Sequence, residues 1–300
     1  MPKYLKRLSL LFLFLFLIVL MTGCTARVSY DDACYEEYTE AELENILEED
    51  DSGAFIEILI SDEAENVGLI LHAGGGDDLT YLNSQETFYR YYDMGYRYFE
   101  YDLKLLCDGR VVGTHNWEYL DVDEVFRLTY DDFISLTLVN GYTPINEEWL
   151  MQTIAQYEDV IFVIDSKMDT DEDDLRVLRR LEELAEADGL DISDRIIPEI
   201  FSKEMWDEAK ETLSFNRYLF SLYKVDYDME QILEYFDDER IVGVSVSLYC
   251  DESLKNQLYR VKESKYLCVF SVTTESEIRE AIDMGADALY VDFVSFTHDT

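Results

Sequence analysis

Three acidic residues and two histidines stand where they could act together. Glu100 and Asp102 lie two residues apart near the end of an apolar run, so in a strand both side chains point to one face. Asp165 ends a later apolar run. The chain has only three histidines, and His72 directly follows another such run, with His115 coming 43 residues later. If the runs are neighbouring parallel strands, their carboxyl ends bring these side chains to one place.

The residue types at this place indicate a particular chemistry. Carboxylates that converge on a partly buried site repel one another unless a cation neutralises them, and an all-oxygen ligand set suits a hard ion such as Mg²⁺ or Ca²⁺. Such an ion can polarise a phosphoryl oxygen, while two imidazoles can take and give protons on either side of the phosphorus. We therefore predict a divalent cation among the converging carboxylates, and phosphodiester chemistry with His72 and His115 as the acid-base pair.

Four more residues near strand ends are candidates for substrate contacts. Lys167 follows Asp165 by two residues, on the same face of the strand, and it could simply pair with that acid. Gly74 begins a run of three glycines, which we expect to let the backbone pass close to a phosphate. Glu199 would add a polar contact, and Tyr223 would either line the mouth of the site or pack in the core.

The segments that must position these residues alternate between apolar runs and amphipathic stretches, as strands and helices do. Helix starts are expected at Asn83, Asn146 and Thr274, and helix ends at Gly95, Gly189 and Gly285. The expected strands are residues 67–71, 97–103, 160–164, 195–200, 218–222, 241–246, 266–271 and 288–292.

Asp108 and Gly109 predict a tight turn after the second strand, from which the chain returns to His115. Eight strands that alternate with helices over about 230 residues predict an α/β fold, a (β/α)8 TIM barrel with a hairpin insertion after the second strand.

The N-terminus predicts export. Three basic residues precede an apolar run from Leu8 to Met21. These 14 residues would span about 21 Å as a helix, short of a hydrocarbon core of about 30 Å, so a signal peptide fits better than a spanning helix. The ending resembles a bacterial lipobox in which Cys24 would carry the lipid, although an ordinary signal peptide or an uncleaved anchor is an alternative. The expected parts are a lipoprotein-type signal peptide at 1–23, an acidic stalk and lead-in helix at 24–65, and the barrel at 66–296.

The amino-acid composition limits the kinds of molecule that the chain can bind. The chain has 66 acidic against 24 basic residues, a formal charge of -42, together with 48% apolar residues. This apolar content can build a large core, so the acidity is not that of a disordered tail. Nucleic acid is excluded as a partner, because no basic cluster lies outside the first seven residues. Membrane attachment would have to come from the lipid anchor, since the charge repels anionic lipid.

The order of motifs resembles the glycerophosphodiester phosphodiesterase family, part of the phosphatidylinositol-phospholipase-C-like TIM barrels. That family has a His-Arg-Gly, a Glu-x-Asp strand, an Asp-Gly hairpin leading to a second His, a Glu-x-Lys strand and a final Gly-x-Asp-Gly segment. The matching residues cover the whole expected barrel: His72-Ala73-Gly74, Glu100-Tyr101-Asp102, Asp108-Gly109 with His115-Asn116, Asp165-Ser166-Lys167, and Gly285-Ala286-Asp287-Ala288 with Val291-Asp292.

The resemblance implies a phosphoric diester hydrolase that acts on a small-molecule or lipid phosphodiester. It implies that the three acids hold the metal, that His72 acts as general base or assists the nucleophile, and that His115 protonates the departing alcohol. Lys167 would contact the phosphate. Whether water or a substrate hydroxyl attacks the phosphorus is left open.

Two departures from the family pattern bear on the substrate. Ala73 stands where the family has the Arg that contacts the phosphate, and Asp165 stands where it has Glu. Spider-venom sphingomyelinase D enzymes resemble this chain in both respects. A sphingomyelinase-D-like or cyclising phospholipase reaction is therefore an alternative, and a non-catalytic barrel lipoprotein is another.

Overall fold

The structure is a computed structural model that describes residues 67–76, 79–117, 120, 128–224, 229–261 and 265–292. The expected signal peptide, the stalk and Cys24 lie outside these residues. Among the described helices, none is both long and apolar enough to cross a bilayer.

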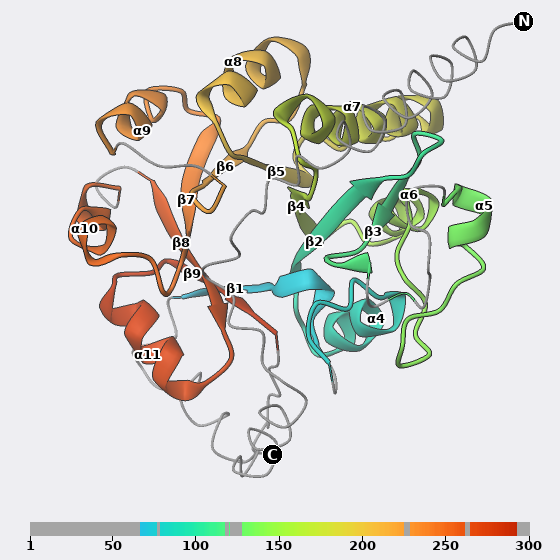
Figure 1. The fold of residues 1–300 in the computed structure, drawn as a ribbon, viewed down its shortest axis with the longest axis horizontal. Helices are drawn as coiled ribbons and strands as arrows, with labels where there is room; N and C mark the ends of the chain where they lie inside the picture. The colour runs from blue at the N-terminus through green and yellow to red at the C-terminus, as the bar shows by residue number, and fades with distance from the viewer. Residues whose placement is uncertain are drawn as a thin grey trace, which may run out of the picture. The chain divides into compact units, whose positions relative to one another are not determined.

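Eight parallel strands form a closed barrel (Figure 1). Each strand pairs with the next around the ring, and β1 pairs with β9 on one side and with β2 on the other, which closes it. The predicted TIM barrel and all eight predicted strands are confirmed, with bounds that differ from the expected ones by one or two residues. The strands are β1 (Gly68–Leu71), β2 (Tyr98–Leu105), β4 (Ile161–Ser166), β5 (Ile196–Ile200), β6 (Tyr218–Ser221), β7 (Ile241–Ser247), β8 (Tyr266–Val272) and β9 (Ala288–Val291).

A ninth strand, β3 (Val111–Gly113), extends the sheet beyond β2. It runs antiparallel to β2, with Leu105 opposite Val111 and Leu103 opposite Gly113. The turn between them uses Gly109 at a φ of 79°, a conformation that glycine adopts without steric cost. The chain thus turns where the Asp-Gly pair predicts, and the hairpin delivers His115 to the carboxyl end of β2.

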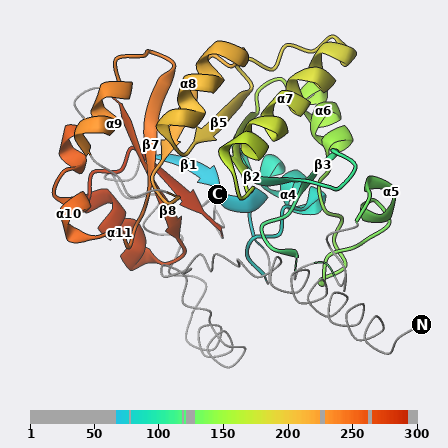
Figure 2. The same cartoon turned by 45° about the horizontal axis from the view of Figure 1, so that its top comes forward.

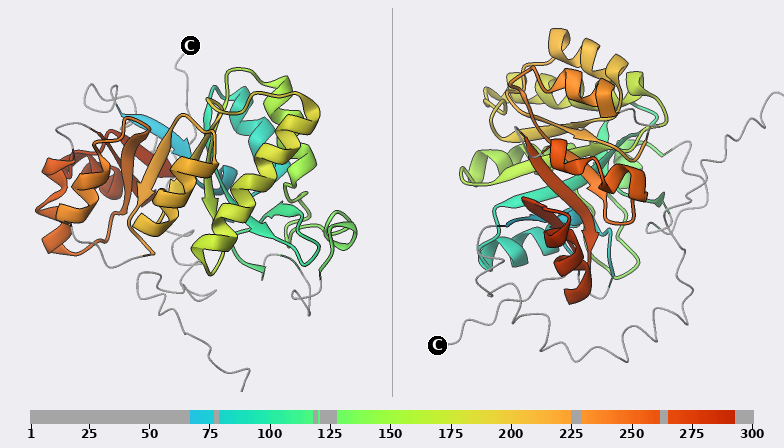
Figure 3. Two further views of the ribbon diagram at one scale, coloured as in Figure 1. Left: turned by 90° about the horizontal axis from the view of Figure 1, so that it is seen from above. Right: turned by 90° about the vertical axis from the view of Figure 1, so that its left-hand side faces the viewer.

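The helices lie outside the ring of strands (Figures 2 and 3). Asn146 and Thr274 cap α6 and α11 as expected, and Gly189 ends α7 in the left-handed conformation. The helices are α4 (Gln85–Asp93), α5 (Tyr130–Phe133), α6 (Glu147–Gln156), α7 (Asp171–Asp188), α8 (Lys203–Thr212), α9 (Met229–Tyr235), α10 (Glu252–Lys255) and α11 (Glu275–Asp283), with short 3-10 turns η1 (His72–Gly74) and η4 (Leu258–Arg260).

The start of α4 differs from the prediction. An N-cap residue needs an extended backbone, and Asn83 has a φ of 47°. Ser84 is extended instead, and its hydroxyl accepts a hydrogen bond from the amide of Thr87. The expectation that Asn83 begins this helix was wrong by one residue, and its side chain has another partner, described below.

Inside the barrel, inward-facing positions change character along the strands. Val163 and Ile197 belong to an apolar cluster in the interior. Two residues further along the same strands, on the same face, come Asp165 and Glu199. Apolar side chains therefore fill one part of the interior, and acidic groups collect toward the carboxyl ends of the strands.

Candidate active site

The three predicted metal ligands lie together at the carboxyl end of the barrel. Strands β2 and β4 are neighbours in register, so Asp102 lies opposite Asp165, with Glu100 two residues earlier. All three residues are buried, and each offers an oxygen atom within 4.8 Å of the others. The carboxylates of two adjacent strands face the same side of the sheet and therefore converge, as the sequence predicts.

This cluster fits a divalent cation. Glu100 Oε1 and Asp102 Oδ1 are buried and accept no hydrogen bond from the described residues. Burial, together with the charges of Asp102 and Asp165, raises the pKa of Glu100 well above its usual range. Buried acceptors without donors are costly, and a cation would satisfy them and relieve the repulsion.

The second carboxylate oxygens of Glu100 and Asp102 accept hydrogen bonds from a backbone amide and a side-chain amide. The amide of Ala73 donates to Glu100 Oε2 at 2.6 Å. The side chain of Asn83 donates to Asp102 Oδ2 at 2.8 Å and accepts from the Asp102 amide at 2.9 Å. Burial by itself would raise the pKa of Asp102, but the charges of His115 and Lys167, among other contacts, lower it overall. Sequence reasoning missed Asn83 as a partner of the site, because a helix cap explained it equally well.

His72 is held from one side. It begins η1 directly after β1, is buried, and its Nδ1 lies 2.8 Å from Asp292 Oδ1 and 3.2 Å from Ser271 Oγ. Burial lowers the pKa of His72, but the charge and hydrogen bond of Asp292 outweigh it, and the pKa is raised. Because Asp292 engages Nδ1, the other ring nitrogen, Nε2, is the one left for chemistry.

His115 belongs to the same group of charges and has a different environment. Burial lowers its pKa to about 4, while Asp102 acts to raise it and Lys167 to lower it further. The ring of Tyr81 contacts both histidines, with centroids 4.3 Å from His115 and 4.9 Å from His72. Tyr81 carries a φ of 54°, and no sequence signal pointed to it.

Lys167 and Tyr223 complete the cluster. Lys167 Nζ lies 2.8 Å from Asp165 Oδ2 and 3.6 Å from Asp102 Oδ1. The Tyr223 hydroxyl donates to Asp165 at 2.9 Å and accepts from Lys167 at 3.3 Å. The Tyr223 hydroxyl is therefore a polar neighbour of the acids, while its ring packs against Phe201 and Phe270.

Glu199 and Gly74 lie close by and have partners within the protein. Glu199 is buried inside the barrel, where the Tyr290 hydroxyl donates to it at 2.6 Å and the Ser245 hydroxyl at 3.3 Å. Burial and the charge of Asp165 raise its pKa to about 7. A Cβ at Gly74 would come within 2.4 Å of the Tyr101 ring, so the glycine is required by packing. The structure brings both residues to the surroundings of the site, and their contacts with a substrate stay predictions.

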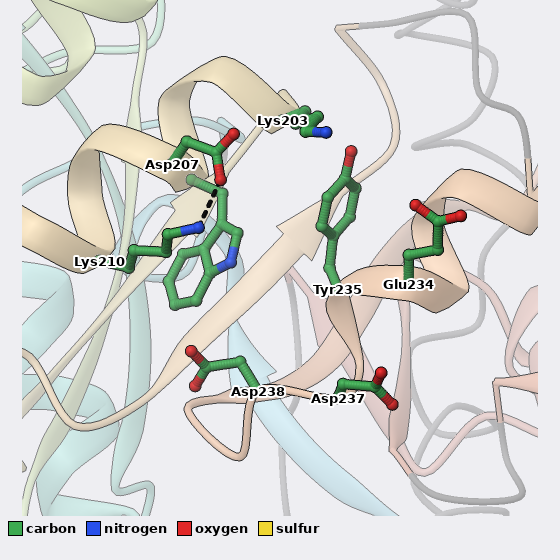
Figure 4. A pocket seen from close by; sticks show the side chains of 8 residues that line it. Lys203, Asp207, Lys210, Glu234, Tyr235, Asp237 and Asp238 are labelled. Atoms are coloured by element: carbon green, nitrogen blue, oxygen red, sulfur yellow. Dashed lines mark hydrogen bonds and ion pairs between the residues drawn. The ribbon is translucent and has the colours of Figure 1, made fainter.

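A separate pocket of about 440 Å³ lies between α8 and α9 (Figure 4). Its lining is mostly charged, with Lys210 paired to Asp207 at 2.5 Å. The pocket contains none of the predicted site residues, and we assign it no role.

No family model and no curated protein sequence matches the chain. Solved structures do match. A glycerophosphodiester phosphodiesterase from Parabacteroides distasonis is 18% identical, with a TM-score of 0.62 over 76% of this chain and 93% of that one. The chain has the fold of that enzyme. Two others agree: a glycerophosphodiester phosphodiesterase from Thermotoga maritima (19% identity, TM-score 0.58, 75% and 94% covered) and an Oleispira antarctica phosphodiesterase in complex with the product sn-glycerol-3-phosphate (15%, 0.60, 75% and 92%).

At these identities the likeness to the glycerophosphodiester phosphodiesterases is one of fold. It confirms the architecture that the motifs implied and leaves the chemistry to the residues themselves.

Proposed function

We propose that this chain is a metal-dependent phosphodiesterase that cleaves glycerophosphodiester-type or phospholipid head-group diesters. One observation carries the proposal: two imidazoles, His72 and His115, share one electrostatic cluster with three buried carboxylates at the carboxyl end of a TIM barrel. The fold shared with glycerophosphodiester phosphodiesterases supports it, as does the fold shared with the Oleispira antarctica phosphodiesterase that holds the product sn-glycerol-3-phosphate.

The three acids would hold Mg²⁺ or Ca²⁺, which supplies a positive charge that polarises a phosphoryl oxygen. Asn83 and the Ala73 amide keep two of these carboxylates in place through Asp102 Oδ2 and Glu100 Oε2, which leaves Asp102 Oδ1 and Glu100 Oε1 for the cation. Lys167 balances Asp165 and adds positive charge beside the phosphate.

His72 is the proposed general base. Asp292 contacts Nδ1 of its ring, as the aspartate of a catalytic triad does, so Nε2 can accept a proton. The Asp292 carboxylate can then stabilise the imidazolium that forms. His115 is the proposed general acid. Burial lowers its pKa to about 4, and an anionic phosphodiester beside it would raise that pKa, so that His115 can hold a proton for the leaving group when the substrate is bound.

The test is a screen of purified residues 25–300 against glycerophosphodiesters, lysophospholipids, sphingomyelin and phosphatidylinositol, with and without EDTA. We expect turnover that EDTA abolishes and that Mg²⁺ or Ca²⁺ restores. His72→Ala and His115→Ala should each lower kcat by about 10²–10⁴-fold. Turnover that survives both chelation and His72→Ala would overturn the mechanism, and no turnover on any diester would favour a non-catalytic binding barrel.

The two histidine roles can be separated with a leaving group that needs no proton. On a p-nitrophenyl phosphodiester, we expect His115→Ala to recover most of its lost activity and His72→Ala to recover little. The reverse pattern would exchange the two roles.

A sphingomyelinase-D-like or cyclising reaction is a second candidate, favoured by Ala73. This residue is fully buried and brings no cation to the site. Phosphorus NMR of the first product distinguishes a cyclic diester from an open-chain monoester, and the substrate screen includes the head groups that this candidate requires.

We also propose that the enzyme is exported and held on the extracytoplasmic face of the cell membrane by lipid at Cys24. The support is the N-terminal sequence. Cell fractionation should find the intact protein with membranes and Cys24→Ser in the soluble fraction; a Cys24→Ser protein that stays with membranes would contradict the lipid anchor.

A further inference from the structure

Besides the proposed divalent cation, Lys167 is the cation assigned so far to the phosphodiester anion. Lys167 is already bound to Asp165 at 2.8 Å and lies 3.6 Å from Asp102. The chain as a whole carries a formal charge of -42, so its field opposes an anionic substrate. A second cationic side chain at the mouth of the barrel would offset this repulsion locally.

Lys104 occupies such a place. It lies on β2 two residues after Asp102 and four after Glu100, and alternate residues of a strand point to the same face. It is also the last but one residue of β2, at the carboxyl end where the site lies, opposite Val112 of the hairpin that carries His115. On β2, Glu100, Asp102 and Lys104 thus follow one another on the same face, in this order toward the carboxyl end of the barrel.

The surroundings of Lys104 differ from those of Lys167. Its Nζ lies 5.4 Å from the centre of the Trp117 ring, a contact that orients an ammonium group without neutralising it. In the part of the chain that the structure describes, no carboxylate lies within ion-pair distance of it, in a protein with 66 acidic residues. Burial lowers its pKa, and the nearby charges that act on it include Asp102, Lys167 and Asp165.

We propose that Lys104 is a substrate-binding residue that contacts the anionic phosphodiester beside Lys167. This inference rests on the proposed function and deepens it: Lys104 supplies local attraction for the anion that the overall charge of the chain repels. Lys167 is engaged mainly in balancing the acids, whereas Lys104 can turn its ammonium group to a ligand.

The test compares three variants. Lys104→Met keeps the length and packing of the side chain and removes the charge, and Lys104→Arg keeps the charge. Lys265→Met is the matched control, because Lys265 precedes β8 at the opposite end of the barrel and donates to the Asp238 carbonyl. We expect Lys104→Met to raise the KM for a glycerophosphodiester at least tenfold while kcat changes less than threefold. Lys104→Arg and Lys265→Met should stay within threefold of the parent in both constants.

A binding measurement separates this inference from the proposed function. The Kd of sn-glycerol-3-phosphate can be measured by calorimetric titration in the presence of Mg²⁺ or Ca²⁺. Lys104→Met should raise this Kd at least tenfold, whether or not any diester is turned over. Absence of turnover together with this weakening would overturn the proposed reaction and retain the binding role. An unchanged Kd and KM in Lys104→Met would overturn the binding role. The binding role would also be overturned if Lys104→Met and Lys104→Arg lost affinity equally and both had a lower Tm. In that case Lys104 would hold the hairpin in place through its contact with Trp117.

Discussion

The contact between His72 and Asp292 can be tested one atom at a time. Asp292→Asn keeps the shape of the side chain and removes the charge that stabilises an imidazolium. We expect kcat to fall by about 10²–10⁴-fold, the range of general acid-base contributions, with little change in KM. Steady-state kinetics at several pH values would measure it, and the basic form of His72 should appear at lower pH because Asp292 raises its pKa.

Ser271→Ala is the matched control for this change, since Ser271 is the other partner of His72 Nδ1 at the longer distance of 3.2 Å. A loss in Ser271→Ala as large as that in Asp292→Asn would show that the hydrogen bond matters and the charge does not.

Tyr81 is the residue that most closely joins the two histidines. It holds a left-handed backbone conformation that costs a non-glycine residue about 1–3 kcal/mol, so the surrounding structure must hold it there. Burial lowers the pKa of His115, and the Tyr81 ring is one of the groups that cover it. Tyr81→Ala should therefore raise the pKa of His115 from about 4 toward 6.5, measured by NMR titration of the imidazole, and should lower kcat.

Tyr81→Phe keeps the ring, so it should leave the pKa of His115 low. If Tyr81→Phe moves that pKa as far as Tyr81→Ala does, the hydroxyl and not ring packing controls His115.

At the scale of elements, Glu147 anchors the β2–β3 hairpin to the helices. Its side chain is fully buried at the start of α6, where it accepts from the Val111 amide at 2.8 Å, from Arg180 at 2.6 Å and from Arg110. Without this charge, Arg180 and Arg110 would keep, among the described acids, only their exposed partners, Glu183 and Glu148. Glu147→Gln should thus lower the free energy of unfolding by about 3–5 kcal/mol, measured by urea denaturation. Glu148→Gln, which removes only an exposed partner of Arg110, should cost about 1 kcal/mol or less.

The same residue predicts a dependence on pH. Burial alone would raise the pKa of Glu147, but its bonds to Arg180, Val111 and Arg110 lower it overall. A carboxylate whose pKa is lower in the folded than in the unfolded protein stabilises the fold above its unfolded value of about 4.5, and this stabilisation is lost as the pH falls through the folded pKa. The stability difference between the parent and Glu147→Gln should therefore shrink below about pH 4.5; a constant difference down to pH 3 would contradict this.

The sequence predicts the strands and helices and the face to which each strand residue points. It does not predict which distant residues contact one another across the barrel. Strand alternation placed Glu100 and Asp102 on one face, and their burial there confirms it. Asn83 was assigned to a helix cap because a cap needs only neighbouring residues. Its contact with Asp102 depends on a φ of 47° and on how β2 meets the turn after β1, and neither is encoded in local spacing. The pairing of Asp292 with His72 likewise joins residues 220 positions apart, which only closure of the barrel brings together.

For the whole molecule, the charge of -42 has two consequences that oppose each other. Three of the acids are the proposed ligands of a cation, and this cation, with Lys104 and Lys167, would make the mouth locally attractive to an anion. Most of the other acids raise a long-range negative potential that an anionic substrate must cross. Charges more than about 10 Å apart are largely screened at 0.1 M salt, whereas contacts within a partly buried site are screened much less.

Added salt should therefore weaken the repulsion more than the binding. At subsaturating concentrations of an anionic glycerophosphodiester and with the divalent cation saturating, kcat/KM should rise as NaCl increases from about 0.01 to 0.15 M, over which the screening length falls from about 30 to 8 Å. Glycerophosphocholine, which is zwitterionic, is the matched control and should show little change because its net charge is zero. If kcat/KM for the anionic substrate falls instead, local attraction by the cation and the two lysines governs the encounter, and the acidic surface has no part in selecting the substrate.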